Sequence, residues 1–115
     1  MSLRRSNRAA AGRLTNAHLF AALGDETRLL LIAKLSRGQP WSISQLTRGS
    51  RLTRQAITKH LRVLERAGVV RNVHAGRESR FEFNPTPIEQ ARQYLHQVSA
   101  EWDRALGRLK AFVEG

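Results

Sequence analysis

The chain has 115 residues, a formal net charge of +11 at neutral pH and no cysteine. This length suits one domain with a real core, and the missing cysteine excludes a disulfide framework and a thiolate metal site. No apolar run approaches the roughly 20 residues needed to span a bilayer, and the first residues lack a signal-peptide core, so we expect a soluble cytoplasmic protein that does not enter a membrane.

Residues 1–14 are expected to form a basic, flexible N-terminal arm. They carry Arg4, Arg5, Arg8 and Arg13, several small residues and no acid. Whether this arm contacts a polyanion or is only a solvated tail is left open. The remainder, residues 15–115, is expected to fold as one domain.

Two short scaffold helices are predicted next. Apolar residues at positions 17, 19, 20 and 23 indicate a helix that ends at Gly24. Asp25 is a suitable N-cap for a second helix through Leu35, which Gly38 and Pro40 then terminate.

A helix, a short turn and a second helix follow. Residues 41–43 suggest a brief extended segment, after which Ser44 is expected to cap a short helix that ends at Gly49. Residues 50–52 form the turn, and Thr53 can cap the next helix by accepting amides of its first turn. This arrangement is a helix-turn-helix.

The helix that starts at Arg54 has two unmixed faces and ends before Gly68, a residue suited to the left-handed position past a helix end. On a helical wheel one arc is largely apolar, although His60 lies at its edge. The opposite arc holds Arg54, Gln55, Thr58, Lys59, Arg62, Glu65 and Arg66. Arg and Gln can each form paired hydrogen bonds with a purine edge, and Lys and Arg can neutralise phosphate. The pattern indicates a DNA recognition helix.

Positive charge is concentrated around this helix. Residues 48–80 contain nine Lys or Arg against two acids, a net charge of +7, whereas residues 86–115 are balanced. One region is therefore suited to a polyanion and the other is not.

A basic hairpin is predicted after the recognition helix. Residues 69–74 and 79–84 read as strands on either side of a turn that contains Gly76. Phe81 and Phe83 share one face, and Arg77 lies at the tip. A hairpin in this position is a wing.

The last predicted helix begins with an apparent capping box, Thr86-Pro87-Ile88-Glu89, in which Thr86 is the N-cap. Its apolar residues repeat at spacings of three and four: Ile88, Ala91, Leu95, Val98, Trp102, Ala105, Leu109 and Phe112. A helix of about 27 residues extends roughly 40 Å, more than this core can cover. We expect it to form most of a homodimer interface, although packing on its own domain is the alternative.

The chain resembles the ArsR/SmtB-type winged-helix transcriptional repressors over nearly all of residues 19–113. The motifs that carry the resemblance are residues 23–28 (LGDETR), 43–46 (ISQL), 58–70 (TKHLRVLERAGVV) and 76–78 (GRE). The resemblance implies a mainly α fold with a small β-hairpin (α+β), a winged helix-turn-helix with a long C-terminal dimerisation helix. It also implies a homodimer that binds a partly palindromic operator on double-stranded DNA, represses transcription and is released by a signal.

The expected roles of individual residues follow from these elements. Base edges are expected to be read by Arg54, Gln55 and Thr58, in the first turns of the recognition helix. Phosphate contacts are expected from Ser44, Arg51, Thr53, Lys59, His60, Arg62, Arg77 and Arg80. The dimer interface is expected to include Leu19, Phe20, Leu23, Leu95, Val98, Trp102 and Leu109.

Other functions fit the sequence less well. No phosphate-binding glycine loop, metalloprotease motif or nucleophile context is present, so we expect neither an enzyme nor a cofactor. Glu89, His96, Glu101 and Asp103 leave one metal-responsive alternative, in which ligands from both subunits meet. A sequence-tolerant architectural protein and a winged helix that binds proteins are further alternatives. The operator and the inducer remain unknown.

Overall fold

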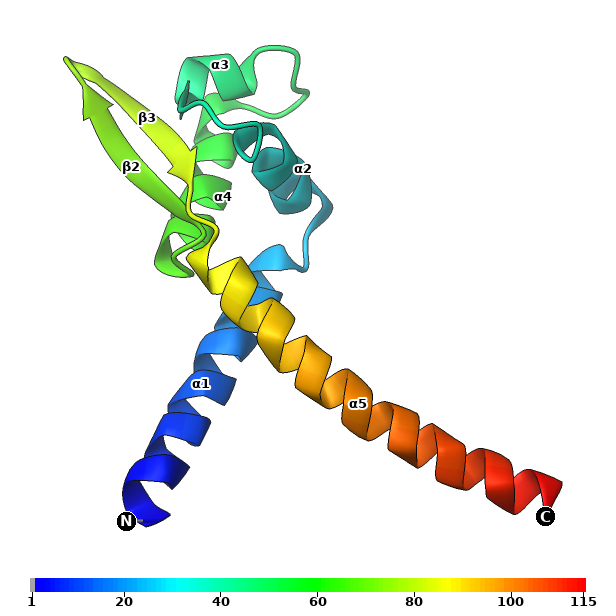
Figure 1. The fold of residues 1–115 in the computed structure, drawn as a ribbon. Helices are drawn as coiled ribbons and strands as arrows, with labels where there is room; N and C mark the ends of the chain where they lie inside the picture. The colour runs from blue at the N-terminus through cyan, green and yellow to red at the C-terminus, as the bar shows by residue number, and fades with distance from the viewer. Residues whose placement is uncertain (1) are drawn as a thin grey trace.

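A computed structural model describes the backbone of residues 2–115 and the side chains of residues 12–74 and 76–115. Five helices and three strands follow one another along this part of the chain (Figure 1). They are α1 (Ser2–Leu23), α2 (Glu26–Leu35), β1 (Trp41–Ser42), α3 (Ile43–Thr47), α4 (Arg54–Arg66), β2 (Val70–Ala75), β3 (Glu78–Phe83) and α5 (Thr86–Glu114). The mainly α fold with a β-hairpin is confirmed.

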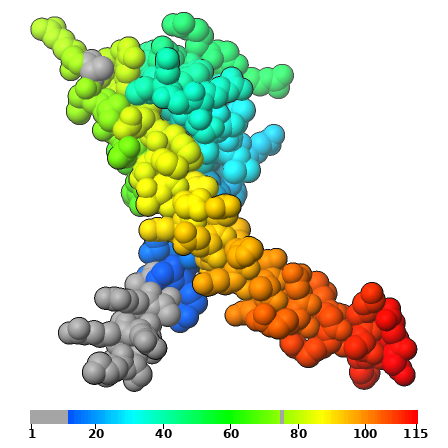
Figure 2. Space-filling model, in the orientation of Figure 1, coloured from blue at the N-terminus to red at the C-terminus, as the bar shows by residue number. Residues whose placement is uncertain are grey.

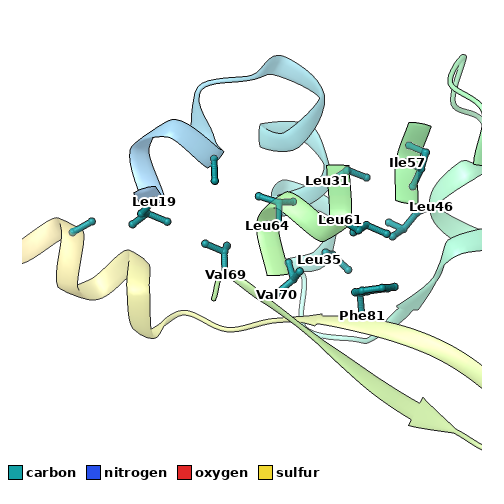
Figure 3. Packing of buried hydrophobic residues seen from close by; sticks show 12 residues of the cluster. Leu19, Leu31, Leu35, Leu46, Ile57, Leu61, Leu64, Val69, Val70 and Phe81 are labelled. Atoms are coloured by element: carbon teal, nitrogen blue, oxygen red, sulfur yellow. The ribbon is translucent and has the colours of Figure 1, made fainter. Parts of the chain in front are cut away.

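The core lies between α2, α3, α4 and the hairpin, and the end of α1 and the first turns of α5 close one side of it (Figure 3). Leu46, Leu61 and Leu64 are completely buried. The remaining buried apolar residues are Leu19, Ala22, Leu31, Leu35, Ile57, Val69, Val70, Phe81 and Ala91. Because the buried residues of α4 recur at helical spacing, only one face of that helix enters the core.

The three strands form an antiparallel sheet in the order β1-β3-β2. Gly76 occupies the turn between β2 and β3 with φ of +67°, a conformation that favours glycine. Trp41 of β1 pairs with Phe81 of β3, which joins the segment before α3 to the base of the hairpin. The sequence indicated the extended segment but not this pairing.

Two predicted N-caps are confirmed and two are wrong, Ser44 at α3 and Thr86 at α5. The Asp25 carboxylate accepts a hydrogen bond from the Arg28 amide at the start of α2, and the Thr53 hydroxyl accepts one from the Ala56 amide at the start of α4. Ser42, and not Ser44, caps α3. Ser42 has Gln45 three residues later, and the two side chains form a reciprocal capping box that Ser44 cannot form with Thr47.

The expected capping box of α5 does not form. Thr86 is the first helical residue and Pro85 occupies the N-cap position. The N-cap residue makes no side-chain hydrogen bond to the first turn of α5. The Asn84 side-chain oxygen accepts the Thr86 amide instead, at 3.3 Å. The Glu89 carboxylate, which the capping box would have used, accepts hydrogen bonds from the Arg92 guanidinium. This contact lowers the pKa of Glu89.

The outer parts of α1 and α5 diverge from the body of the protein, so the molecule measures 64 × 40 × 22 Å (Figure 1). Its radius of gyration of 18.7 Å exceeds the roughly 13 Å expected for a compact chain of this length. All residues from 101 to 115 are exposed, and this end of α5 projects alone in Figure 2.

Helix α1 begins at Ser2, whereas the sequence was expected to form a flexible arm through residue 14. Ala-rich sequence continues without a glycine or proline up to Gly12, and alanine favours a helix. The side chains of residues 1–11, including Arg4, Arg5 and Arg8, lie outside the described residues. Any contact of the arm with DNA therefore stays a prediction.

Candidate nucleic-acid interface

The interface is built around α4, which separates apolar from basic residues. Ile57, Leu61 and Leu64 are at most 1 % exposed and hold the helix against α2 and α3. The opposite face is exposed and carries Arg54, Gln55, Lys59, Arg62, Glu65 and Arg66. Because burial fixes the rotation of the helix about its axis, the basic residues must face outward together.

Both ends of α4 are formed by local hydrogen bonds. The Thr53 hydroxyl lies 3.1 Å from the Ala56 amide nitrogen that it accepts. At the other end Gly68 has φ of +78°, and the Val69 amide donates to the Leu64 carbonyl over 3.1 Å. The chain therefore leaves the helix sharply and enters β2, which places the hairpin beside α4.

The three residues expected to read bases differ in their surroundings. Gln55 is exposed on the first turn. The Thr58 hydroxyl donates to the Arg54 carbonyl over 2.8 Å, which leaves its methyl group and an oxygen lone pair available. The Arg54 Nη1 donates to the Ser44 Oγ over 2.9 Å, so its guanidinium lies toward α3.

The hairpin continues the basic surface of α4. Arg77 is exposed at the turn, as expected for a wing tip. The Arg80 guanidinium lies 3.1 Å from a Glu78 carboxylate oxygen, so Glu78 partly neutralises this cation. A groove of about 450 Å³ between the wing and α4 is lined by Ile43, Thr58, Arg62, Glu65, Arg66, Asn72, Ser79 and Phe81. Helix and wing thus form one surface.

His60 does not belong to this surface, although it was expected to contact phosphate. Its Nδ1 accepts from the Arg28 Nη1 over 3.3 Å and lies 3.9 Å from an Asp25 carboxylate oxygen. The ring is therefore held at the junction of α1, α2 and α4. The backbone amide of Arg28 also lowers the pKa of Asp25.

Arg28 is a structural residue whose role the sequence analysis missed. Besides His60, its guanidinium contacts the carbonyls of Ala21 and Ala22 at the end of α1. One side chain thus connects α1 to the recognition helix. The sequence does contain a pattern that could have indicated this role: Arg28 lies on the same face of α2 as the core residues Leu31 and Leu35.

The remaining predicted contacts are distributed over two regions. Ser44, Arg51 and Thr53 are exposed around the start of α4, where they were expected to meet phosphate.

The residues expected at the dimer interface differ in exposure. Leu95, Trp102 and Leu109 are exposed along α5, and Val98 is half-buried. Phe20 and Leu23 pack partly against the core, and Leu19 is only 1 % exposed. Leu19 therefore belongs to the core of its own chain and cannot contact a partner.

The described part of the chain holds no group of three or more His, Asp or Glu side chains that could bind a metal ion. Of the four residues considered for a shared site, Glu89 is engaged by Arg92. No helix within residues 2–115 has both the length and the apolar character needed to cross a membrane.

Comparisons with known proteins agree with this geometry. A helix-turn-helix domain family matches residues 23–73. The uncharacterized HTH-type transcriptional regulator YuzN of Bacillus subtilis is 39 % identical over 77 residues, which cover 62 % of this chain and 84 % of YuzN. The HTH-type transcriptional regulator Rv2034 of Mycobacterium tuberculosis is 33 % identical over 87 residues, which cover 76 % and 78 % of the two chains.

Solved structures show the same likeness. An ArsR-like transcriptional regulator from Rhodococcus sp. RHA1 superimposes with a TM-score of 0.76 and 37 % identity, covering 87 % of this chain and 93 % of that chain. An ArsR family transcriptional regulator, RHA00566, gives a TM-score of 0.71 at 26 % identity, with coverages of 79 % and 93 %.

Proposed function

We propose that this protein acts as a homodimeric repressor in the cytoplasm. The premise is its family: the chain belongs to the ArsR-like family of DNA-binding helix-turn-helix transcriptional regulators. Its operator would be partly palindromic, because two-fold protein symmetry is matched by two related half-sites. The protein uses no catalytic chemistry in this role.

The observation that carries the proposal is the single basic surface made by α4 and the wing. The residues from 48 to 80 that build this surface have a net charge of +7, whereas residues 86–115 have none. Neutralising phosphates releases counterions, which drives binding to duplex DNA. The exposed face of a helix held by a buried apolar stripe is suited to lie in the major groove.

Base reading is assigned to Gln55 and Thr58, two of the three residues expected to read bases, which lie in the first two turns of α4. A glutamine amide matches the donor and acceptor of adenine, and the threonine methyl can contact the methyl group of thymine. Phosphate contacts are assigned to Lys59 and Arg62 of α4, to Arg77 and Arg80 of the wing, and to Ser44, Arg51 and Thr53 beside the turn.

The proposed dimer is supported by apolar surface that one chain leaves uncovered. Trp102, Leu106 and Leu109 of α5 are 58–62 % exposed, and Phe112 and Val113 are still more exposed. Contiguous apolar surface of this kind marks an interaction site rather than a monomer surface. A second copy is the proposed cover, with α5 as the main contact and α1 around Phe20 and Leu23 completing it. Phe20 already contacts Tyr94 of α5, with ring centroids 6.4 Å apart.

Residues 15–115 are proposed to act as one winged helix-turn-helix domain with dimerisation helices at both ends. The inducer is left unassigned. A metal signal is retained only as the alternative in which His96 and either Glu101 or Asp103 of α5 form a site shared across the dimer.

The proposal is tested by selecting binding sequences for the full chain from a pool of randomised DNA duplexes. We expect enrichment of two related half-sites with centres about 10 base pairs apart. Light scattering at micromolar concentration should give the mass of a dimer. A pool that shows no enriched sequence would favour the sequence-tolerant architectural protein, and a monomeric mass would contradict the dimer directly.

A further inference from the structure

A hollow separates the wing from the helix-turn-helix and brings residues of both together. It encloses about 510 Å³ and is lined by Ser42, Ile43, Ser44, Arg54, Arg77, Glu78 and Ser79. Arg54 and Arg77 are 23 residues apart in the sequence and reach the hollow from different elements. The fold therefore places two arginine residues beside one space.

Arg54 is held at this hollow by a specific contact. Its Nη1 donates to the Ser44 hydroxyl oxygen over 2.9 Å. A guanidinium has five N–H donors, so this bond leaves the others free, and the Ser44 hydroxyl can still donate its own hydrogen. The Thr58 hydroxyl donates to the Arg54 backbone carbonyl, so this bond does not involve the Arg54 guanidinium.

The charge around the hollow is positive. Glu78 is the one acid among the residues lining it, and its carboxylate already accepts two hydrogen bonds from the Arg80 guanidinium, at 3.1 and 3.3 Å. Arg54 and Arg77 are both exposed and lack an ion pair with any described residue within 4.0 Å. Two guanidinium forks and a hydroxyl match the oxygens of a phosphodiester, which arginine binds in a bidentate manner.

We propose that Arg54, Ser44 and Arg77 together bind one backbone phosphate of duplex DNA, and that Arg54 is therefore not a base-reading residue. The inference rests on the proposed function, since it requires the wing and α4 to meet DNA together. Sequence discrimination then falls on Gln55 and Thr58, and Arg54 fixes the register of α4 in the groove.

The first test compares Arg54→Ala with Gln55→Ala by fluorescence anisotropy, using the duplex selected by the wild-type protein and a scrambled duplex. We expect Arg54→Ala to weaken both complexes by a similar factor and to reduce the salt slope by at most about 0.9 for each protomer, because Arg77 still contacts the phosphate. The ratio of the two affinities should change by less than about twofold. Gln55→Ala, the matched control, should lower that ratio about fivefold or more and leave the slope unchanged. A ratio that collapses in Arg54→Ala would overturn the inference.

The second test removes phosphate charges one at a time by methylphosphonate substitution in the selected duplex. One position should weaken wild-type binding, and its effect should be smaller in Arg54→Ala and in Arg77→Ala than in the wild type, because each variant lacks one of the two side chains that bind that phosphate. Effects that add fully at every position would overturn the shared site. Arg54→Lys keeps the charge without the fork and should retain the salt slope while binding more weakly than the wild type.

The two proposals fail in distinguishable ways. If the wild-type protein selects no sequence, the operator proposal fails, but the salt slope of Arg54→Ala on random duplex still tests the phosphate site. If selection succeeds and Arg54→Ala changes the preferred bases, the phosphate assignment alone fails.

Discussion

The proposed dimer is tested most directly at Trp102, which is 62 % exposed on α5. A tryptophan buries roughly 150–250 Å² in a core. At about 25 cal/mol per Å², covering the exposed part of this side chain stabilises the dimer by about 2–4 kcal/mol for each protomer. Because both protomers lose this side chain, Trp102→Ala should raise the dimer dissociation constant by roughly several hundred-fold or more.

Sedimentation equilibrium over a concentration series measures this constant. The matched control is Arg104→Ala, because Arg104 lies on the opposite side of the same helix and is also exposed. Trp102 lies in the stretch of α5 where every residue is exposed, so the thermal unfolding of the isolated protomer should change little. Affinity for the selected duplex should fall in Trp102→Ala, although no DNA-contacting residue is altered. An unchanged dissociation constant in Trp102→Ala would refute the assignment of this helix to the interface.

Three further predictions concern the stability of the domain. Leu61→Ala, at a fully buried position, should lower the free energy of unfolding by about 2–5 kcal/mol in urea titrations; a loss below 1 kcal/mol would contradict its place in the core. Ser42→Ala should cost about 1 kcal/mol in the same assay and more than Ser44→Ala, and the reverse order would restore Ser44 as the cap. Asp25 has a lowered pKa, so its charge stabilises the fold above its ordinary pKa of about 3.9, and this contribution is lost as the pH falls through the lower folded value. Asp25→Asn should therefore show a smaller drop in melting temperature between neutral pH and pH 3 than the wild type, and an equal drop would contradict the role of the charge.

Several elements were predictable because their signals act over a few residues. Thr53 as an N-cap and Gly68 past the end of α4 were both expected and both observed. Each acts through hydrogen bonds to the adjacent turn, so its signal is contained in a few neighbouring residues. The wing turn at Gly76 follows from the same kind of local preference.

The wrong capping predictions occurred where two different local hydrogen-bonding arrangements were possible. Ser42 and Ser44 were both possible caps for α3, and Trp41 decided between them, because its pairing with Phe81 holds the chain extended up to Ser42. The capping box at Thr86 met every local requirement, yet Asn84 accepts the Thr86 amide and Arg92 takes the Glu89 carboxylate. The Asn84 side chain also donates to the Gly68 carbonyl, and because these residues are 16 positions apart, no short sequence motif could predict this contact.

The sequence by itself therefore determined the order of the elements, the two faces of α4 and the concentration of charge around it, since each depends on residues close together in the chain. Only the tertiary structure decided that Leu19 is buried, that His60 contacts Arg28 and that Arg54 shares a hollow with Arg77. His60 and Arg28, like Arg54 and Arg77, are far apart in the sequence. The periodicity of apolar residues shows which face of a helix a residue occupies, but it does not show which other element covers that face. The packing of α1, α2 and the wing around α4 supplies that information.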